Sequence, residues 1–399
     1  MHTRRLVLTL QFAMGVLAAG YGVMFTMLDD WRREYGIQET GLSMIIAIGF
    51  FTSFVAQLTI APLADKGHAR KLLSLGMLAN AVGAVMMAFG ESLPAFLLGR
   101  FVMGLGAGIA IPAIKRIVIV SDPENIGRNL GRGVSIEVAG FAIGPVISAL
   151  TVDAFNLAAP FIIITALTMV FGVIISQLNI SETAVEDRTD ERFALDLLKL
   201  RPVLGSILVG LALYVMIGVY DSLWVIMMDD LQAPNWVGNA GVALFGLPWI
   251  FFGTLGGKIA QRHGPLRVSA FGLAMGALHM TSYGFLSMPY LMLGIGLSQS
   301  ILDSLTVTGT GIAVAQATPP ERQAGASGLL GGMQTLTGGV SAVAAGVLYE
   351  HFGQAFAFSA TGIVMALLVT VGCVLAGKQW LRKPSPELAL LGRAREHST

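Results

Sequence analysis

Three carboxylates lie inside long apolar stretches of the sequence, where an acidic side chain is costly. Glu137, Asp221 and Asp303 each occur in a hydrophobic run that is long enough to cross a bilayer. Removal from water favours the protonated form of a carboxylate, so such a group can gain and lose a proton near neutral pH. The chemistry predicted for these residues is reversible proton binding, and the alternative for each is a structural hydrogen bond between helices.

Helical spacing adds polar or aromatic neighbours to two of these acids. Gln299 lies one turn from Asp303, while Tyr214 and Trp224 fall on the same side of a helix as Asp221. An acid flanked by aromatic rings suits a lipophilic cation. We therefore predict a substrate cavity, and the following residues are expected to line it: Tyr21, Arg100, Tyr214, Asp221, Trp224, Gln299 and Asp303.

Arg100 is a basic residue inside an apolar segment. It lies about seven residues, or roughly 10 Å of helix, from the outer end of that segment. A charge at such a depth costs on the order of 3 kcal/mol or more unless it faces water or a partner. Arg100 is therefore expected to face the central cavity, where it tunes a nearby carboxylate or binds an anionic group. A structural bond to carbonyls at a helix end is the alternative.

The elements that must position these residues are transmembrane helices. Of the 399 residues, 54% are hydrophobic and only 12% are charged. A crossing takes about 20 mostly apolar helical residues, and the short alternating segments of barrel strands do not occur. The sequence predicts an all-α membrane protein with twelve spans, at residues 6–28, 42–63, 72–90, 94–117, 131–152, 157–178, 202–228, 237–260, 268–287, 290–315, 325–348 and 354–377.

The charges predict the topology and exclude several classes of protein. Lys and Arg fall almost entirely on the side of the N-terminus, apart from Arg32, Arg33 and Arg100. This bias predicts a multi-pass protein of the cell membrane with both termini in the cytoplasm. The basic residues form no single patch, so nucleic-acid binding is not expected. One Cys and six scattered His offer no nucleophile and base pair and no metal-ligand cluster, so we expect neither an enzyme nor a metal site.

The two halves of the chain repeat each other. MLDD at 27–30 matches MMDD at 227–230, and PENIGRNLG at 123–131 matches PERQAGASG at 320–328. We predict two six-helix bundles, at 1–178 and 202–377, with a cytoplasmic linker at 179–201 and a cytoplasmic tail at 378–399. Parallel repeats of this kind occur in secondary transporters, which bind substrate between the halves.

A loop at 61–71, APLADKGHARK, resembles the signature of the major facilitator superfamily. The acid and basic residues of that signature fit, and a weaker second-half copy has Gln261 in place of the acid. The resemblance implies a major facilitator fold of two pseudo-symmetric six-helix bundles. In this family such loops latch the outward-facing state, so it also implies a latch made by Asp65, Lys66, Arg70, Lys71 and Arg262. Loop charges that only set the topology are the alternative.

Two further motifs refine the resemblance. Arg100 and Gly104 fit a second motif of the superfamily, and the pattern Gly131-x8-Gly140-x3-Gly144-Pro145 resembles the antiporter helix of drug/proton antiporters. Small residues replace the final two glycines of that pattern. Glu137 shares the face of these small residues, and this face is expected to meet the opposite half of the chain.

The resemblance implies proton-coupled efflux of amphipathic small molecules by a monomer. The expected partners are the substrate, protons and the lipid bilayer, and the proton gradient supplies the energy without a cofactor. Proton-coupled import, transport of a lipid or lysolipid, and a sensor that does not transport remain alternatives. Asn80 and His279 lie on helices that this fold places at its periphery, so structural roles are expected for them.

Two acidic doublets lie at the outer ends of the first and seventh spans, and they are Asp29, Asp30, Asp229 and Asp230. The short loops beside them offer no further ligands for a metal. We predict that the doublets approach each other across a closing outer gate, where four carboxylates repel unless they are protonated or paired. Simple solvated acids at a membrane boundary are the alternative.

Overall fold

The computed structural model describes residues 2–180, 182 and 193–378. Regular structure in these residues is α-helical or 3-10 helical, and no strand occurs among them, so the all-α prediction is confirmed. Most of the predicted linker and tail lies outside the described residues. The described end of the linker forms a 3-10 helix, η4 (Ala194–Lys199), directly before the next span.

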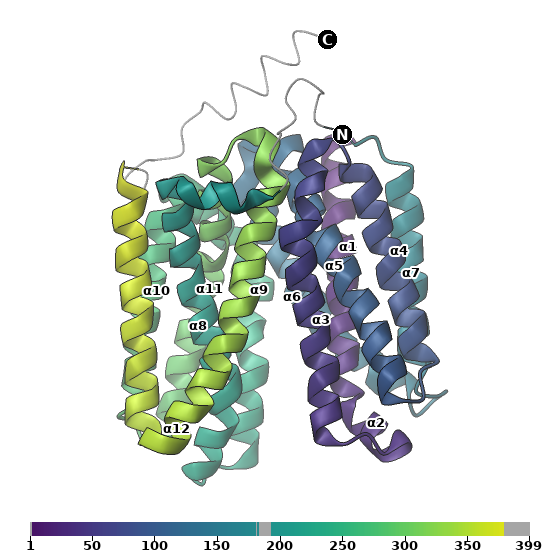
Figure 1. Cartoon of the computed structure of the whole chain (residues 1–399). Coiled ribbons are helices and arrows are strands. Elements are labelled where there is room, and N and C mark those ends of the chain that lie inside the picture. The colour runs from purple at the N-terminus through teal and green to yellow at the C-terminus, as the bar shows by residue number, and fades with distance from the viewer. Residues whose placement is uncertain (1, 181, 183–192, 379–399) are drawn as a thin grey trace. The chain divides into compact units, whose positions relative to one another are not determined.

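Each predicted span is found in a helix. The first half of the sequence contains α1 (His2–Thr26), α3 (Glu39–Thr59), α4 (Ala69–Ala88), α5 (Leu93–Ser121), α6 (Ile126–Thr151) and α7 (Ala159–Ser176). The second half contains α8 (Arg201–Asp230), α9 (Asn235–His263), α10 (Pro265–Tyr283), α11 (Pro289–Ala317) and α12 (Gln323–Ala376) (Figure 1). Within the described part of the chain, nine segments combine the length and hydropathy of a membrane span.

The helix α12 holds two of the predicted spans. Its 54 residues are interrupted at Gly353, where the backbone has φ 77° and ψ 178°. A positive φ of this size is accessible to glycine at little cost because glycine has no Cβ atom. With α9 and α10, which have 29 and 19 residues, the helices account for all twelve predicted spans.

The chain forms two compact units that do not follow a simple division of the sequence. The first contains residues 1–122, 136–195 and 320–332, and the second contains residues 123–135, 196–319 and 333–399. The start of α6 therefore groups with the helices of the second half, and the start of α12 groups with those of the first half. Both loop signatures lie next to these exchanged starts.

In the first unit, α4 packs closely on α5, and small residues make this possible. A Cβ atom added to Gly83 would lie 2.6 Å from the backbone nitrogen of Met103, so a larger residue has no room there. The short helix α2 (Leu28–Tyr35) follows α1, and its Trp31 stacks on Phe96 of α5 with ring centroids 4.4 Å apart. These contacts hold α5, which carries Arg100, in a fixed position.

In the second unit, α11 packs on α8, α9 and α10. Its core is aromatic: Tyr220 of α8 stacks on Trp224 at 4.9 Å and on Phe245 of α9 at 4.6 Å between ring centroids. Tyr283 of α10 meets Trp224 edge to face at 6.1 Å. This cluster lies beside the first half of α11, because the hydroxyl groups of Tyr283 and Tyr220 are 3.0 and 3.3 Å from a Cβ atom added at Gly296.

Candidate functional site

Asp303 lies at the end of a chain of polar side chains inside the second unit. Its side chain is fully buried, and its Oδ1 accepts a hydrogen bond of 2.6 Å from Gln299 Nε2 one turn earlier on α11. The other amide atom of Gln299, Oε1, is bonded to Nδ1 of His279 on α10. Oδ2 of Asp303 has no hydrogen-bond partner among the described residues. A half-buried imidazole is thus connected to a fully buried carboxylate through one amide.

Within the second unit, the residues predicted to line the substrate cavity have different surroundings. Gln299 and Asp303 are in contact, but Trp224 is buried in the helical core, and its Nε1 donates a 3.0 Å hydrogen bond to the Gly238 carbonyl. Asp221 lies near Trp224 along α8, yet its side chain is exposed on its unit. The acid and the tryptophan therefore occupy different faces of α8, because three positions along a helix can still separate a core face from an exposed face.

Arg100 of the first unit is held by aromatic rings. Its guanidinium carbon lies 4.0 Å from the ring centroid of Tyr21 on α1 and 5.9 Å from that of Phe50 on α3. The side chain is fully buried, and none of its three nitrogens has a hydrogen-bond partner among the described residues. A guanidinium carries five N–H donors, so this group is ready to bind an anionic or carbonyl group. The alternative of a structural bond to helix-end carbonyls does not occur in the described structure.

Gly49 of α3 creates the space that Arg100 occupies. A Cβ atom added at this position would lie 2.3 Å from Arg100 Nε and 2.7 Å from its guanidinium carbon. Gly104, one turn after Arg100, has a similar role, because its added Cβ would lie 2.3 Å from the Gly49 carbonyl oxygen. The predicted motif around Arg100 and Gly104 thus meets a glycine of α3 that sequence reasoning missed.

Glu137 of α6 differs from Asp303 in its surroundings. Its side chain is half-buried, and Lys115 of α5 is its charged neighbour. The position that matches Glu137 in the second half holds Gln334, whose Nε2 donates a 3.4 Å hydrogen bond to the Gly210 carbonyl of α8. Glu137 therefore has a cationic counter-charge inside the first unit, whereas Asp303 has only an amide.

The glycines of α6 pack on two different helices. A Cβ atom added to Gly140 would lie 2.0 Å from the Gly15 carbonyl oxygen of α1, and one added to Gly144 would lie 2.5 Å from the Val23 nitrogen. The expectation that this face meets the opposite half is wrong for these two residues. Gly131 does pack on a second-half helix, because its added Cβ would lie 2.2 Å from the Gly253 carbonyl oxygen of α9. Pro145 lies inside α6 beside Gly144.

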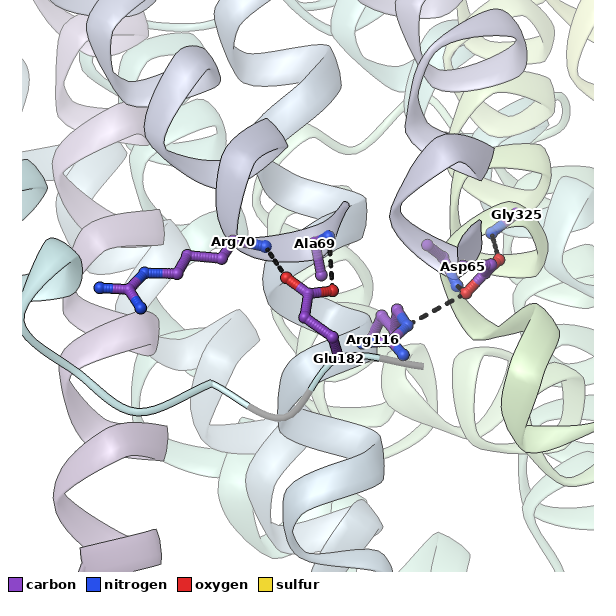
Figure 2. A network of polar contacts seen from close by, with 7 residues as sticks. Asp65, Ala69, Arg70, Arg116, Glu182 and Gly325 are labelled. Carbon is purple, nitrogen blue, oxygen red and sulfur yellow. Dashed lines mark hydrogen bonds and ion pairs between the residues drawn. The ribbon is translucent and has the colours of Figure 1, made fainter. Parts of the chain in front are cut away.

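The first loop signature holds the start of α12 through one carboxylate (Figure 2). Asp65, in the 3-10 helix η1 (Ala61–Lys66), is buried and accepts hydrogen bonds from the backbone nitrogens of Ala324 at 2.9 Å and Gly325 at 2.7 Å. Its Oδ1 also lies 3.2 Å from Nε of Arg116 on α5. The carboxylate thus satisfies unpaired N–H groups of a helix N-terminus and is neutralised by a buried cation.

A second carboxylate holds the start of α4 in the same region (Figure 2). Glu182 accepts hydrogen bonds from the backbone nitrogens of Ala69 at 2.9 Å and Arg70 at 2.7 Å. The guanidinium of Arg70 bonds to the Ser176 carbonyl at the end of α7. Lys71 and Arg262, two other predicted latch residues, are exposed, and Lys66 is half-buried.

The second loop signature holds the start of α6 with a neutral side chain. Gln261 Oε1 accepts a 2.8 Å hydrogen bond from the Gly127 nitrogen, and Gln261 Nε2 donates a 2.7 Å bond to the Glu124 carbonyl. Gln261 therefore takes the place of Asp65 in the repeat. One signature uses an ion pair and the other uses an amide.

The acidic doublets differ in their surroundings. Asp230 Oδ2 accepts a 2.7 Å hydrogen bond from the Tyr349 hydroxyl within the second unit, and Asp229 is exposed. Asp30 is half-buried, while the Asp29 side chain lies outside the described residues. No group of three or more His, Cys, Asp or Glu that could hold a metal occurs in the described part of the chain.

Comparisons with known proteins agree with the two repeated halves. A sequence profile described as Major Facilitator Superfamily matches residues 10–223 and 203–397. The quinolone resistance protein NorA of Staphylococcus aureus (strain MRSA252) is 23% identical over 140 residues, which are 35% of this chain and 36% of NorA. The match thus spans about a third of that relative.

Solved structures share the fold at low identity. A crystal structure of the E. coli fucose:proton symporter FucP is similar with a TM-score of 0.77 and 14% identity, over 95% of this chain and 99% of FucP. The human organic anion transporter MFSD10 (TETRAN) is similar with a TM-score of 0.71 and 16% identity, over 94% of this chain and 100% of MFSD10. With nearly the whole chain matched by the profile, this multi-pass membrane protein belongs to the major facilitator superfamily, a family of transporters.

Proposed function

We propose that this transporter exports amphipathic small molecules in exchange for protons, and that Asp303 carries the exchanged proton. The observation that carries this proposal is the state of the Asp303 carboxyl, which is fully buried and has one oxygen without a partner among the described residues. A buried carboxylate without a cation is unfavourable, and protonation removes its charge. Proton binding at Asp303 therefore removes a buried charge and makes this buried position much more favourable for the side chain.

The direction of transport is supported by the antiporter-type helix and by one relative. The pattern from Gly131 to Pro145 resembles that of drug/proton antiporters, and NorA is named as a quinolone resistance protein. The proposal further includes a location in the cell membrane with both termini in the cytoplasm, a monomeric state, and the proton gradient as the energy source without a cofactor. FucP, named as a symporter, has the same fold, so direction must be measured.

Each unit by itself offers a side chain that suits substrate recognition. Arg100 presents an unpaired guanidinium beside Tyr21 and Phe50, which suits a molecule with an acidic or carbonyl group next to a ring. Asp221 is exposed on α8 and is available to a cationic group. Glu137, with Lys115 beside it, is the second candidate for proton coupling.

Coupling follows from alternating access. A ligand shifts a conformational equilibrium only by the difference in its affinity for the two states. The ionised and the protonated form of Asp303 differ in charge at a buried position. The two forms can therefore favour different conformational states of the transporter. Exchange of a proton for substrate at each cycle therefore drives export from the proton gradient.

Transport into inside-out vesicles with an acidic lumen tests this proposal. A fluorescent amphipathic dye is expected to accumulate in the lumen while the gradient lasts, and an uncoupler should abolish the accumulation. Asp303→Asn should remove the dependence on the gradient, because an amide does not release a proton in this range. Depletion of the dye from the lumen would indicate an importer, and gradient-driven accumulation by Asp303→Asn would exclude Asp303 as the coupling acid.

A further inference from the structure

We propose that Gln299 is a two-position amide relay that connects the proton on Asp303 to the tautomer of His279. The proposal rests on the proposed function, because it requires Asp303 to gain and lose a proton. Sequence reasoning placed His279 on a peripheral helix with a structural role. The structure instead places its ring against the amide that holds Asp303.

The orientation of the amide fixes the protons at both ends of the relay. Gln299 Nε2 donates to Asp303 Oδ1, and Gln299 Oε1 faces His279 Nδ1. An amide oxygen only accepts and an amide NH2 only donates. This orientation therefore uses Asp303 Oδ1 as an acceptor, as an ionised carboxylate offers it, and needs a neutral His279 ring that carries its proton on Nδ1.

Protonation of Asp303 favours the opposite orientation. The carboxyl then has an O–H that needs an acceptor, and Asp303 Oδ2 has none among the described residues. A half-turn of the Gln299 amide lets Oε1 accept from the Asp303 O–H and lets Nε2 donate to a bare His279 Nδ1. Both hydrogen bonds of the relay are then formed again, which matters because an unsatisfied buried polar group costs about 1–3 kcal/mol.

The protons balance in this exchange. Asp303 takes up one proton from water, and an O–H bond forms. The neutral imidazole of His279 keeps one ring proton: the N–H bond at Nδ1 breaks, an N–H bond forms at Nε2, and the exchange requires a water molecule at the ring that accepts one proton and returns another. The relay as a whole gains one proton and no other group changes its charge.

Other ionisable groups around Asp303 do not replace the amide. From α10, the Tyr283 hydroxyl faces this region but donates its 3.2 Å bond to the Met292 carbonyl. From α8, Tyr220 belongs to the aromatic stack, and Asp221 is exposed. On α9, Gly256 packs beside Ser304 and Leu305 of α11. The ionisable residues Lys258, Arg262 and His263 come later on α9, beyond this contact in the sequence.

Nitrogen NMR of the histidine rings in the full-length protein tests the relay. With 15N-labelled His, the shifts of Nδ1 and Nε2 report which nitrogen carries the proton, and His279→Gln assigns the signal by its loss. In the wild type, the neutral ring is expected to change from the Nδ1–H to the Nε2–H form as Asp303 becomes protonated. Asp303→Asn should hold the ring in one tautomer at every pH at which it is neutral, because the introduced amide neither gains nor loses a proton.

Gln299→Met separates the relay from a direct effect of charge. It keeps the length of the side chain but removes both hydrogen bonds, so the tautomer of His279 should no longer respond to Asp303→Asn. His263 of α9 is the internal control, since its Nδ1 contacts the Ile259 carbonyl at 3.1 Å and lies outside the relay. Unchanged His263 shifts also show that a variant is folded.

Two results would overturn the relay: a change of the His279 tautomer with pH that persists in Asp303→Asn, or one that persists with Gln299→Met. If Asp303→Asn does not fold, the pH titration of the wild type against Gln299→Met still decides. Gradient-driven transport is measured separately with the same variants. Transport that survives in Asp303→Asn contradicts the proposed function, whereas an unresponsive tautomer with lost transport contradicts the relay alone.

Discussion

At the scale of single residues, the two units use buried polar groups in opposite ways. Among the described residues, the buried Asp303 carboxyl is hydrogen-bonded to an amide, and the buried Arg100 guanidinium lies against aromatic rings without a hydrogen-bond partner. A cation over an aromatic face gains about 2 kcal/mol when it is desolvated, which offsets only part of the cost of burying it. Both groups are therefore poised to respond to a proton or to a charged ligand.

Gly49→Ala is expected to displace the Arg100 guanidinium, because the new Cβ would lie 2.3 Å from Nε. We expect a higher KM for substrates that carry an acidic group and a smaller effect on neutral ones. Transport assays with paired acidic and neutral substrates measure this difference. Gly172→Ala in α7 is the matched control, since its nearest neighbour atom would be 3.8 Å away. Equal effects on both substrates would contradict a role of Arg100 in recognition.

Arg100→Lys keeps the charge but loses the flat guanidinium that stacks on Tyr21. An ammonium is more strongly hydrated and lacks the fork of N–H donors, so it fits a dry aromatic site poorly. We expect transport of acidic substrates to fall at least tenfold, with the protein still folded. Retention of wild-type transport would show that only the charge matters. Substrate saturation curves in proteoliposomes provide the measurement.

At the scale of helices, the starts of α4, α6 and α12 are each held by a side chain from elsewhere in the sequence. Asp65 and Glu182 use carboxylates, and Gln261 uses an amide. Anionic caps gain from the helix dipole, whereas a neutral amide gains only its hydrogen bonds. The two loop signatures are thus similar in position but unequal in electrostatics.

Asp65→Asn should destabilise the start of α12 by about 3 kcal/mol, because it removes the buried negative charge that faces Arg116 and the N–H groups of the helix start. Hydrogen exchange at the amides of Ala324 and Gly325 is expected to accelerate, while α4 is unaffected. Glu182→Gln is the control on the neighbouring cap, and its exposed position limits the loss to about 1 kcal/mol. Equal protection of α12 in both variants would contradict this role of Asp65.

Gly140→Ala is expected to push α6 away from α1, since the added Cβ would meet the Gly15 carbonyl oxygen at 2.0 Å. Overpacking of this kind typically costs about 1–3 kcal/mol. Gly133→Ala on the same helix is the control, because no atom lies within 4 Å of its added Cβ. Thermal unfolding in detergent compares the two. A lower midpoint for Gly133→Ala than for Gly140→Ala would be inconsistent with the packing.

At the scale of the whole molecule, transport requires the two units to change their arrangement. The prediction that the acidic doublets act as an outer gate belongs here. The structure adds that Asp230 is held by Tyr349 inside its own unit, which fixes one carboxylate of the second doublet.

Replacement of Asp29, Asp30, Asp229 and Asp230 by Asn should favour the state that is closed on the outer side, because repulsion among the four carboxylates is removed. Spin labels at the outer ends of α1 and α8 measure the distance distribution between the halves. Tyr349→Phe, which frees Asp230 but keeps its charge, should have little effect in the same measurement. Distances that depend neither on pH nor on the Asn substitutions would refute the gate.

Much of this protein was determined by the sequence alone. Apolar runs of span length predict helices because a bilayer satisfies no backbone polar group, and all twelve were found. The loop signatures predict the family, and their repetition in the second half predicts two similar bundles. Both predictions are possible because these short motifs keep their spacing in the sequence. Gln299 beside Asp303 was also predictable, since one turn of helix brings them together on α11.

Only the tertiary structure decided which side chains meet across helices. Periodicity places a residue on a face but does not say which neighbour that face meets, so the contact of His279 with Gln299 and that of Gly49 with Arg100 were missed. The same limit explains why Gly140 packs on α1 while Gly131 packs on α9. Asp221 and Trp224 occupy different faces of α8 because burial depends on the surrounding helices, and these are known only once the chain has folded.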